Sequence, residues 1–361
     1  MDPSDFPAPQ PTPIEKVSPS LANQLLACSL RVAFTHDSSY RSLRRPSTFS
    51  VLGEVAHAIA ELAYKGTGFD EDEPAARAWL EQQWERESKR QAAKLGAAWA
   101  PASPPPPVEW PGYNLTRART VRRGARLLAS QRRVREASER VSGTGIELEL
   151  EDPESRLYGR ADRIERNGNR TRIVDLKSGL HQGEPTGDQH RQLLLYAVLA
   201  QRSTGEWPSE IAIEDASGAQ MAIELDPATA EKALADVMAA VSAFNEDVSS
   251  VDFRTKAEPN PDRCRWCAFR VVCGPYWQEL TTEWEHRSVF GEIEEAGGSD
   301  RGGFVRVLVA SPVDLAGRSV HVSSLAGRTS PQATHLAIVD VGGSVASEDV
   351  RARWSSLWRA W

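Results

Sequence analysis

Residues 159–179 read GRADRIERNGNRTRIVDLKSG, two runs of alternating apolar and polar residues with an Asn-Gly pair between them. Asn-Gly flanked by such runs is a strong signal for a two-residue hairpin turn. With Asn167-Gly168 as the turn, the runs on either side predict two antiparallel strands. We therefore take this hairpin as the centre of the predicted fold.

The predicted hairpin gathers charged residues on one face. Counting outward from the turn, Asp162 faces Ile173 and is a diagonal neighbour of Asp175, about 5–8 Å away. Because residues i and i+2 of a strand share a face, Lys177 lies on the same side as both acids. The opposite face, which can pack against a core, carries Ala161, Val174 and Leu176.

Two carboxylates and a lysine at one place can hydrolyse phosphodiester bonds. Mg²⁺ prefers oxygen ligands and is usually held by one or two carboxylates together with substrate phosphates. A metal can activate a water molecule and shield the charge that develops at phosphorus. Lys177 would position that water or stabilise the charge. The alternative interpretation of D-x-K is an exposed charged hairpin without a catalytic role.

Length and composition are those of an ordinary globular protein of 361 residues, 40% of them hydrophobic, with a formal net charge of −7. The length predicts about two or three domains, and the acidic balance means that any nucleic-acid surface is local. No apolar run approaches a membrane span. Residues 1–17 are Pro-rich without an apolar signal region, so we expect a disordered tail and a cytoplasmic protein without structural disulfides.

Apolar residues at helical spacing predict several helices around the hairpin. The helix over 49–65 has His57 near the edge of its apolar stripe, where a histidine is usually structural but can also supply a missing metal ligand. The Pro-rich segment 97–113 is predicted to be a linker or insertion. Further helices are predicted over 24–34, 73–95, 114–141, 186–204 and 227–248, and short strands over 145–150, 211–213 and 220–225.

The predicted helix over 114–141 is strongly basic. It carries nine arginines against Glu136 and Glu139, a local charge of +7 in a chain of −7. One face can pack against the protein, and the remainder can follow a phosphate backbone. The alternative is an ordinary solvated helix face.

Three of the four cysteines form the pattern C-x2-C-x5-C at Cys264, Cys267 and Cys273. The fourth, Cys28, lies in the helix predicted over 24–34, which Ser20 can cap. Clustered thiols in a reducing compartment indicate a metal. Zinc more often takes two tight pairs, whereas a three-plus-one split suits a four-thiolate iron–sulfur cluster better; zinc and no metal remain the alternatives. Such a group would close a large loop and stabilise the fold.

From about residue 283 the composition changes to strand-like segments separated by Gly, Pro and Ser, followed by a Trp-rich segment over 350–361 that we predict to be helical. Residues 283–361 are therefore predicted to form a small β-rich domain, for which an OB-like barrel is one candidate. OB-like barrels often bind single strands. A structural or protein-docking module is the alternative.

Six short motifs follow one another along the chain. They are S-x-S with a cysteine (Ser18, Ser20, Cys28), G-x-x-x-H (Gly53, His57), G-x-x-D-x-I (Gly159, Asp162, Ile164), D-x-K-S-G (Asp175, Lys177, Ser178, Gly179), Q-x-x-x-Y (Gln192, Tyr196) and C-x2-C-x5-C. In this order residues 18–277 resemble the RecB-like branch of the PD-(D/E)xK nucleases, in the cluster-bearing form of CRISPR-associated RecB-like exonucleases and AddB-type nuclease domains. One departure is Ser29, where that family usually has proline after the first cysteine.

The resemblance implies an α/β, restriction-endonuclease-like core over residues 18–282 with a helical N-terminal part, followed by the small β-rich domain over 283–361. It implies a Mg²⁺ or Mn²⁺ site and a 4Fe–4S cluster. The metal ligands would be His57, Asp162, Asp175 and the Leu176 carbonyl; Lys177 would be catalytic; Gln192 and Tyr196 would orient the site and contact DNA; Cys28, Cys264, Cys267 and Cys273 would hold the cluster.

The functional hypothesis is a metal-dependent deoxyribonuclease, more an exonuclease than an endonuclease, that cuts single-stranded or frayed DNA in repair, CRISPR-type processing or phage defence. The sequence has no G-x-x-x-x-G-K-[ST] motif, so a helicase or another defence or repair protein would supply unwinding. One alternative is a DNA-binding or assembly subunit that keeps the nuclease fold but scarcely cuts. Another is a zinc-stapled protein-interaction module.

Overall fold

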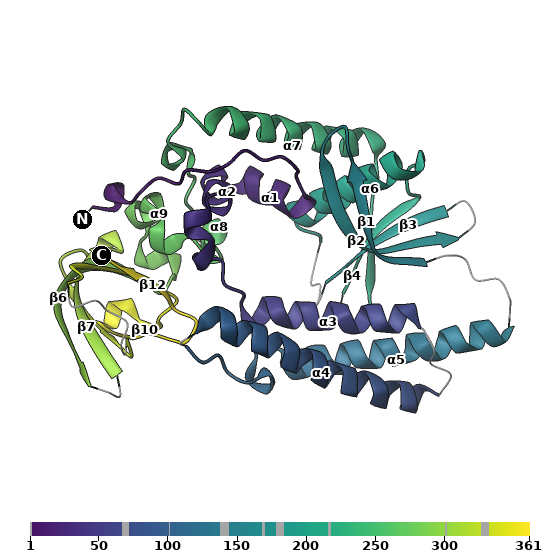
Figure 1. Ribbon diagram of the computed structural model, residues 1–361, viewed down its shortest axis with the longest axis horizontal. Coiled ribbons are helices and arrows are strands. Elements are labelled where there is room, and N and C mark those ends of the chain that lie inside the picture. Colours follow the sequence, from purple (N-terminus) through teal and green to yellow (C-terminus); the bar gives the residue numbers. More distant parts are fainter. Residues whose placement is uncertain are drawn as a thin grey trace.

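The computed structural model describes residues 2–66, 72–100, 102–137, 144–167, 170–177, 184–215, 218–299, 302–325 and 332–361. Its centre is a five-stranded mixed sheet with helices on both sides, and a second, C-terminal sheet lies at the far end of the molecule (Figure 1). This arrangement confirms the predicted α/β core with a C-terminal β-rich part.

The central sheet has the strand order β1-β2-β3-β4-β5. Neighbouring strands pair antiparallel except β3 and β4, which are parallel. The parallel pair needs a crossover connection, which contains helix α6 (Gly187–Thr204). The strands are β1 (Thr144–Asp152), β2 (Leu157–Asn167), β3 (Arg170–Leu176), β4 (Glu210–Glu214) and β5 (Gln220–Ile223).

The hairpin forms between β2 and β3, but its predicted register is wrong by two residues. Asn167 pairs with Arg170 and Ile164 with Ile173, whereas the two residues between Asn167 and Arg170 lie outside the described residues. Continued by one step beyond the last observed pair, Arg163 and Val174, this register would set Asp162 opposite Asp175 and not diagonal to it. Gly-Asn is as suitable a hairpin pair as Asn-Gly, so the sequence offers two turns. A two-residue shift keeps every side chain on its predicted face.

Helices cover both faces of the central sheet (Figure 1). On one side lie α6 and α7, and on the other α3 packs against α4 and α5 in an arm with its own apolar core. Thr186 caps α6 with its side chain, and Gly66 ends α3 in the left-handed conformation that glycine favours. The bounds are α3 (Thr48–Lys65), α4 (Glu73–Trp99), α5 (Tyr113–Ala137) and α7 (Pro227–Asp247).

The N-terminal helix predicted over 24–34 is two helices, α1 (Pro19–Ala27) and α2 (Ser29–His36), which meet at Cys28. Cys28 has extended backbone angles, φ −166° and ψ 106°, and the cap of α1 is Ser18 and not Ser20. The sequence pattern did not indicate this break, because the apolar residues keep helical spacing on both sides of Cys28.

The first residues of the chain differ from the disordered tail that the sequence analysis expects. The Phe6 side chain is fully buried, with its ring 5.3 Å from that of Phe290 and 4.9 Å from that of Trp361. Val17 forms a bridge with Leu157 at the start of β2. The N-terminal segment therefore connects the central sheet with the C-terminal one.

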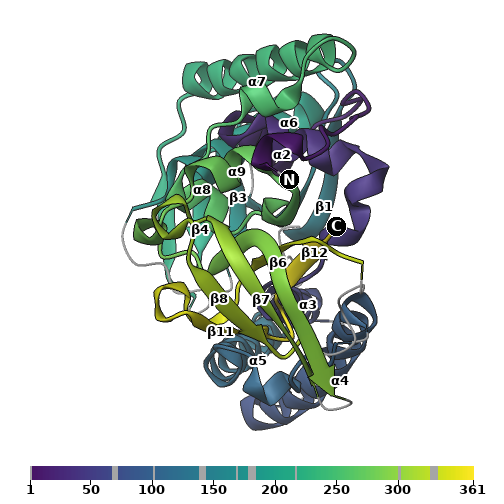
Figure 2. The same cartoon turned by 90° about the vertical axis from the view of Figure 1, so that its left-hand side faces the viewer.

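The C-terminal sheet has seven strands in the order β10-β11-β8-β7-β6-β9-β12 and faces the viewer in Figure 2. In the described part of the chain this order does not close, so the sheet is a half-barrel and not the OB-like barrel that was one candidate. The helix predicted over 350–361 is wrong, because the backbone of β12 pairs with β9. The strands are β6 (Ser288–Ser299), β7 (Gly302–Ser311), β8 (Ser319–Ser323), β9 (His335–Val339), β10 (Gly342–Ser344), β11 (Asp349–Arg351) and β12 (Leu357–Ala360).

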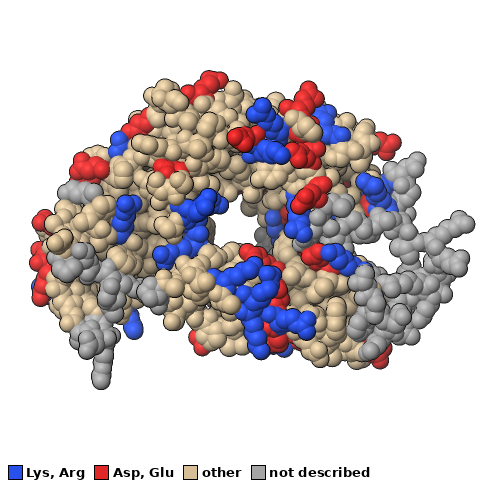
Figure 3. All heavy atoms as spheres, viewed as in Figure 1, with Lys and Arg blue, Asp and Glu red and all other residues tan. Residues whose placement is uncertain are grey.

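The C-terminal sheet packs on the cysteine-bearing segment, which contains α8 (Pro261–Arg265) and α9 (Gly274–Glu279). Phe290 of β6 belongs to the same buried cluster as the residues of α9. The C-terminal part makes a second contact with the arm, where the ring of Trp354 lies 5.4 Å from that of Trp99 at the end of α4. The two contacts complete a ring of structure around an opening, and Figure 3 shows Lys and Arg side chains at its rim.

Among the described residues, none of the helices combines the length and the apolar character needed to cross a membrane.

Candidate active site

The structure brings His57, Asp162 and Asp175 to the same end of the central sheet. The Nδ1 atom of His57, from α3, lies 3.6 Å from the Oδ1 atom of Asp162 on β2. The backbone N–H of Leu176, beside Asp175 on β3, donates a hydrogen bond of 2.7 Å to the other oxygen of Asp162. The imidazole and both carboxylates thus come from three different elements.

Lys177 stands directly beyond the end of β3 and is held at both its main chain and its side chain. Its backbone N–H donates to the Glu214 carbonyl at 2.8 Å, and its Nζ atom lies 2.7 Å from Asp175 Oδ2. Gln192 of α6 bridges the pair, donating from Nε2 to Asp175 Oδ1 at 3.3 Å and accepting from Lys177 Nζ at 3.5 Å. One turn further on, the Tyr196 hydroxyl donates to the Arg160 carbonyl at 3.0 Å.

Without a bound cation, the surroundings of Asp175 disfavour its charged form. Asp175 is only 6% exposed, and its burial, with Asp162 adding to the effect, raises its pKa although Lys177 opposes the shift. Burial, followed by the two carboxylates, raises the pKa of Tyr196 to about 12, so its hydroxyl stays neutral. A positive charge between the acids would relieve the repulsion, which is the electrostatic setting of a cation site.

The donor types fit a hard divalent cation, because carboxylates, a backbone carbonyl and one imidazole suit Mg²⁺ or Mn²⁺. The side chains would still have to move closer to one another to share such a cation. In the part of the chain that the structure describes, no three His, Cys, Asp or Glu side chains are grouped closely enough to hold a metal as they stand. Ser178 and Gly179 of the predicted motif lie outside the described residues.

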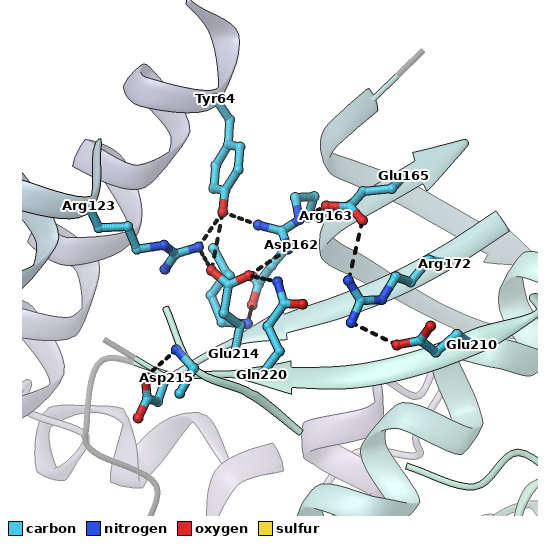
Figure 4. A network of polar contacts seen from close by, with 12 residues as sticks. Tyr64, Arg123, Asp162, Arg163, Glu165, Arg172, Glu210, Glu214, Asp215 and Gln220 are labelled. Carbon is cyan, nitrogen blue, oxygen red and sulfur yellow. Dashed lines mark hydrogen bonds and ion pairs between the residues drawn. The ribbon is translucent and has the colours of Figure 1, made fainter. Parts of the chain in front are cut away.

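Directly beneath these residues lies a buried ionic network that the sequence analysis missed (Figure 4). Arg163 is 1% exposed, and its Nη2 atom lies 2.6 Å from Glu214 Oε2. The Tyr64 hydroxyl accepts hydrogen bonds from Arg163 and Arg123 and donates to Glu214 Oε1 at 3.2 Å. Arg123 also pairs with Glu214, so two guanidinium groups share one buried carboxylate.

The network joins the elements that carry the site. Arg163 follows Asp162 on β2, and Glu214 is the register partner of Leu176. Tyr64 lies two helical turns after His57 on α3. The network therefore fixes the strand ends and α3 relative to one another. The sequence does contain one indication of this network. Strand alternation places the charged Arg163 on the face that otherwise carries the apolar residues Ala161 and Val174.

Glu214→Ala is expected to destabilise the protein by about 3–5 kcal/mol, because it leaves two buried guanidinium groups without their shared counter-charge. Thermal or urea unfolding measures the change. The matched control is Glu231→Ala: Glu231 pairs with Arg202 at 2.9 Å, and the two side chains are 40% and 35% exposed, so the expected cost is below about 1 kcal/mol. Equal unfolding of both variants would contradict a central role of Glu214.

The basic face of α5 is partly used inside the protein. Arg117 pairs with Glu81 of α4 at 2.6 Å, and Arg123 belongs to the buried network. These arginines are thus less free to follow a phosphate backbone than the sequence suggests. Arg123 does line a small cavity of about 20 Å³ that also borders His57 and Lys177, so α5 reaches the end of the sheet where the candidate site lies.

All four cysteines line one cavity of about 320 Å³ near α8. Burial raises the pKa of Cys264 to about 11 and also raises the pKa values of Cys267 and Cys273. Burial therefore favours the protonated thiol at these three cysteines, and a thiolate at any of them is stabilised by a bound cation. The helix is interrupted at Cys28, and this first cysteine lines the same cavity as Cys264. The two residues are 236 positions apart in the sequence.

The mixed sheet thus brings two aspartates and a lysine to one end, beside a histidine of α3. The chain belongs to the PD-(D/E)XK nuclease superfamily, whose family model matches residues 16–274. No curated protein matches the chain. The matched segment contains the central sheet, its helices and all four cysteines, and it ends before the C-terminal sheet. The protein is thus a nuclease acting on nucleic acid, and members of this superfamily typically depend on a metal.

Proposed function

We propose that this protein is a RecB-like, Mg²⁺- or Mn²⁺-dependent deoxyribonuclease that cuts single-stranded or frayed DNA, as an exonuclease more than as an endonuclease. The observation that carries the proposal is the convergence of His57, Asp162, Asp175 and Lys177 at one sheet end. Lys and Arg side chains at the rim of the opening in Figure 3 favour an anionic strand as substrate in a protein of net charge −7.

In this proposal His57, Asp162, Asp175 and the Leu176 carbonyl hold the divalent cation, which when bound lowers the pKa of a water molecule and shields negative charge on the phosphate. Lys177, whose Nζ atom lies 2.7 Å from Asp175 Oδ2, directs its Nζ–H groups at the attacked phosphate. Gln192 keeps Lys177 and Asp175 in place through its amide. The neutral Tyr196 hydroxyl anchors the Arg160 main chain, two residues before Asp162.

We also propose that the four cysteines hold a 4Fe–4S cluster with a structural role. The supporting observation is that all of them border one cavity of about 320 Å³. A single zinc ion would draw four sulfurs to about 2.3 Å from one point, whereas a cluster occupies a larger space between them. The cluster would connect α1 and α2 with α8 and α9, near the base of the C-terminal sheet.

The experiment that tests the function is digestion of labelled linear, end-blocked and circular single strands by the purified protein with Mn²⁺ or Mg²⁺. We expect cutting of linear strands, weaker cutting of blocked or circular ones, and none in Asp175→Ala. An inactive native protein that still binds DNA would overturn the enzyme assignment and favour the assembly-subunit alternative, to which the separation of the metal-ligand side chains gives some support.

The pathway belongs to the proposal as well. Repair, CRISPR-type processing and phage defence all need a cytoplasmic nuclease that removes single strands, with a helicase or another defence or repair protein as the partner that unwinds the duplex. A co-purified motor protein that increases degradation of duplex DNA would support this, and equal degradation with and without it would contradict it.

Lys177→Ala is expected to lower the cutting rate by about 10²–10³-fold, because a charge aimed at the transition state is worth that much. DNA affinity should be largely kept, since one contact among many is lost. Single-turnover cutting and anisotropy binding measure the two effects. Lys232→Ala, an exposed lysine of α7 paired with Asp236, is the control with the same charge change. Cutting preserved in Lys177→Ala would remove Lys177 from the mechanism.

A further inference from the structure

A second cavity, of about 730 Å³, is lined by residues of both the cysteine-bearing segment and the C-terminal part. One wall is the Arg265-Trp266 tip, and the other wall is built by residues of the C-terminal part, including Arg287 and Arg353. Arg270 lies between the two walls. The family match ends at residue 274, so this cavity exists only because the C-terminal sheet is present.

Trp266 gives the cavity an exposed aromatic platform. Its side chain is 78% exposed, more than any other large apolar side chain in the described part of the chain. The guanidinium carbon of Arg265 lies 5.3 Å from the centre of the ring. Water contact over that much indole surface is unfavourable, and an aromatic ring next to an arginine is a surface on which a nucleic-acid base can stack.

The cavity also carries positive charge that the protein leaves unused. Arg270 is already paired within the protein, because its Nη2 atom lies 2.8 Å from Asp340 and its Nε–H donates to the Cys267 carbonyl at 2.9 Å. The guanidinium groups of Arg265, Arg287 and Arg353 form no ion pair within the described ranges. With Asp340 neutralised by Arg270, Glu285 is the remaining acid in the lining.

The walls are fixed by buried contacts. His286, next to Arg287, bonds through its two ring nitrogens to the Tyr276 hydroxyl at 3.2 Å and to the Pro261 carbonyl at 3.0 Å. The Arg270–Asp340 pair joins the cysteine segment to the C-terminal sheet directly. The arginines therefore project from a framework that is ordered before any ligand binds, which lowers the cost of binding.

We propose that this cavity is a second binding site for single-stranded DNA, in which a base stacks on Trp266 and neighbouring phosphates contact Arg265, Arg287 and Arg353. A single strand is the occupant that fits, because only unpaired bases offer a face to the indole while their phosphates stay within reach of the arginines. The inference rests on the proposed function, since it gives the substrate of that nuclease a holding site away from the catalytic end of the sheet.

Binding of a fluorescein-labelled dT20 strand, measured by anisotropy without divalent cations, tests the site independently of cutting. Arg287→Gln with Arg353→Gln is expected to weaken binding by about tenfold and to reduce the slope of log affinity against log salt by about 1.4, about 0.7 for each lost phosphate contact. The matched control is Arg306→Gln with Arg318→Gln, two exposed arginines of the same C-terminal part outside this cavity, which should bind like the native protein.

Trp266→Ala should weaken binding by about tenfold, within the range measured for loss of one stacked base, and Trp266→Phe should keep most of the affinity. Irradiation of a strand with 5-bromodeoxyuridine should crosslink to the peptide that contains Trp266. Unchanged affinity and an unchanged salt slope in these variants would overturn the second binding site. The nuclease proposal would still stand in that case if the native protein cut the strand in a metal-dependent way. A native protein that neither binds nor cuts the strand would overturn both.

Discussion

Asp175→Asn is expected to lower the cutting rate by about 10³-fold or more while leaving the metal-free protein at least as stable as the native one. The loss of activity follows because a neutral amide binds a divalent cation poorly, and metal stabilisation of the transition state is worth several kcal/mol. The gain in stability follows from burial, because the native carboxylate is 6% exposed and the Asp162 carboxylate further disfavours its charged form. A residue kept only for structure would show the reverse.

The pH dependence of this prediction has a definite sign. Burial raises the pKa of Asp175 above its ordinary value of 3.8 in the folded protein, with Asp162 adding to the effect. A carboxyl group with a raised folded pKa stabilises the fold fully below 3.8 and loses that contribution as the pH rises through its folded pKa. The stability advantage of Asp175→Asn should therefore appear at neutral pH and shrink in acid.

Melting curves with and without Mn²⁺ separate the two effects. Mn²⁺ should raise the melting temperature of the native protein, because a ligand that binds only the folded state stabilises it, and should raise that of Asp175→Asn much less. Asp236→Asn, at an exposed site on α7, is the control. A strongly destabilised Asp175→Asn protein, or one that still cuts, would show that the carboxylate is structural.

The face of the hairpin that carries the candidate site residues could be predicted because strand alternation has a period of two residues. The actual register differs from the predicted one, yet Asp162, Asp175 and Lys177 share the predicted location, since a shift of two residues preserves the side-chain faces. The register itself could not be predicted, because both Asn167-Gly168 and the pair after it can form a two-residue turn. The convergence with His57 depended on helix packing and was inferred only by resemblance.

The buried network shows what a sequence pattern cannot supply. Arg163 and Glu214 are charged residues, which are almost never fully buried unless they are paired. A prediction from the sequence alone therefore treats Arg163 and Glu214 as exposed. Their pairing can be recognised only in the folded sheet, where β2 and β4 lie on either side of β3. The β12 strand was missed for a related reason: Trp354, Trp358 and Trp361 have helical spacing, but the available edge of β9 decides their backbone conformation.

Cys267→Ala is expected to have the largest effect on stability. If Cys28, Cys264, Cys267 and Cys273 hold a cluster, it closes a loop of more than 200 residues. Cross-links that close loops longer than about 100 residues are worth about 5 kcal/mol, which corresponds to a fall in melting temperature of about 10–20 °C. The Cys267 carbonyl also accepts a hydrogen bond from Arg270, which pairs with Asp340 of the C-terminal part. A less ordered cysteine segment should therefore also destabilise the C-terminal sheet.

The native protein should be brown, with iron–sulfur charge-transfer absorption and iron and sulfide in the preparation, whereas Cys267→Ala should be pale, less soluble and more readily cleaved by protease in the C-terminal sheet. Trp266→Phe is the control, because it changes the neighbouring residue without removing a thiol. A colourless native protein that contains zinc would favour the zinc-stapled alternative. A soluble, active Cys267→Ala protein that melts like the native one would show that the four thiols carry no structural group, since a shared metal centre cannot lose one ligand without cost to the fold.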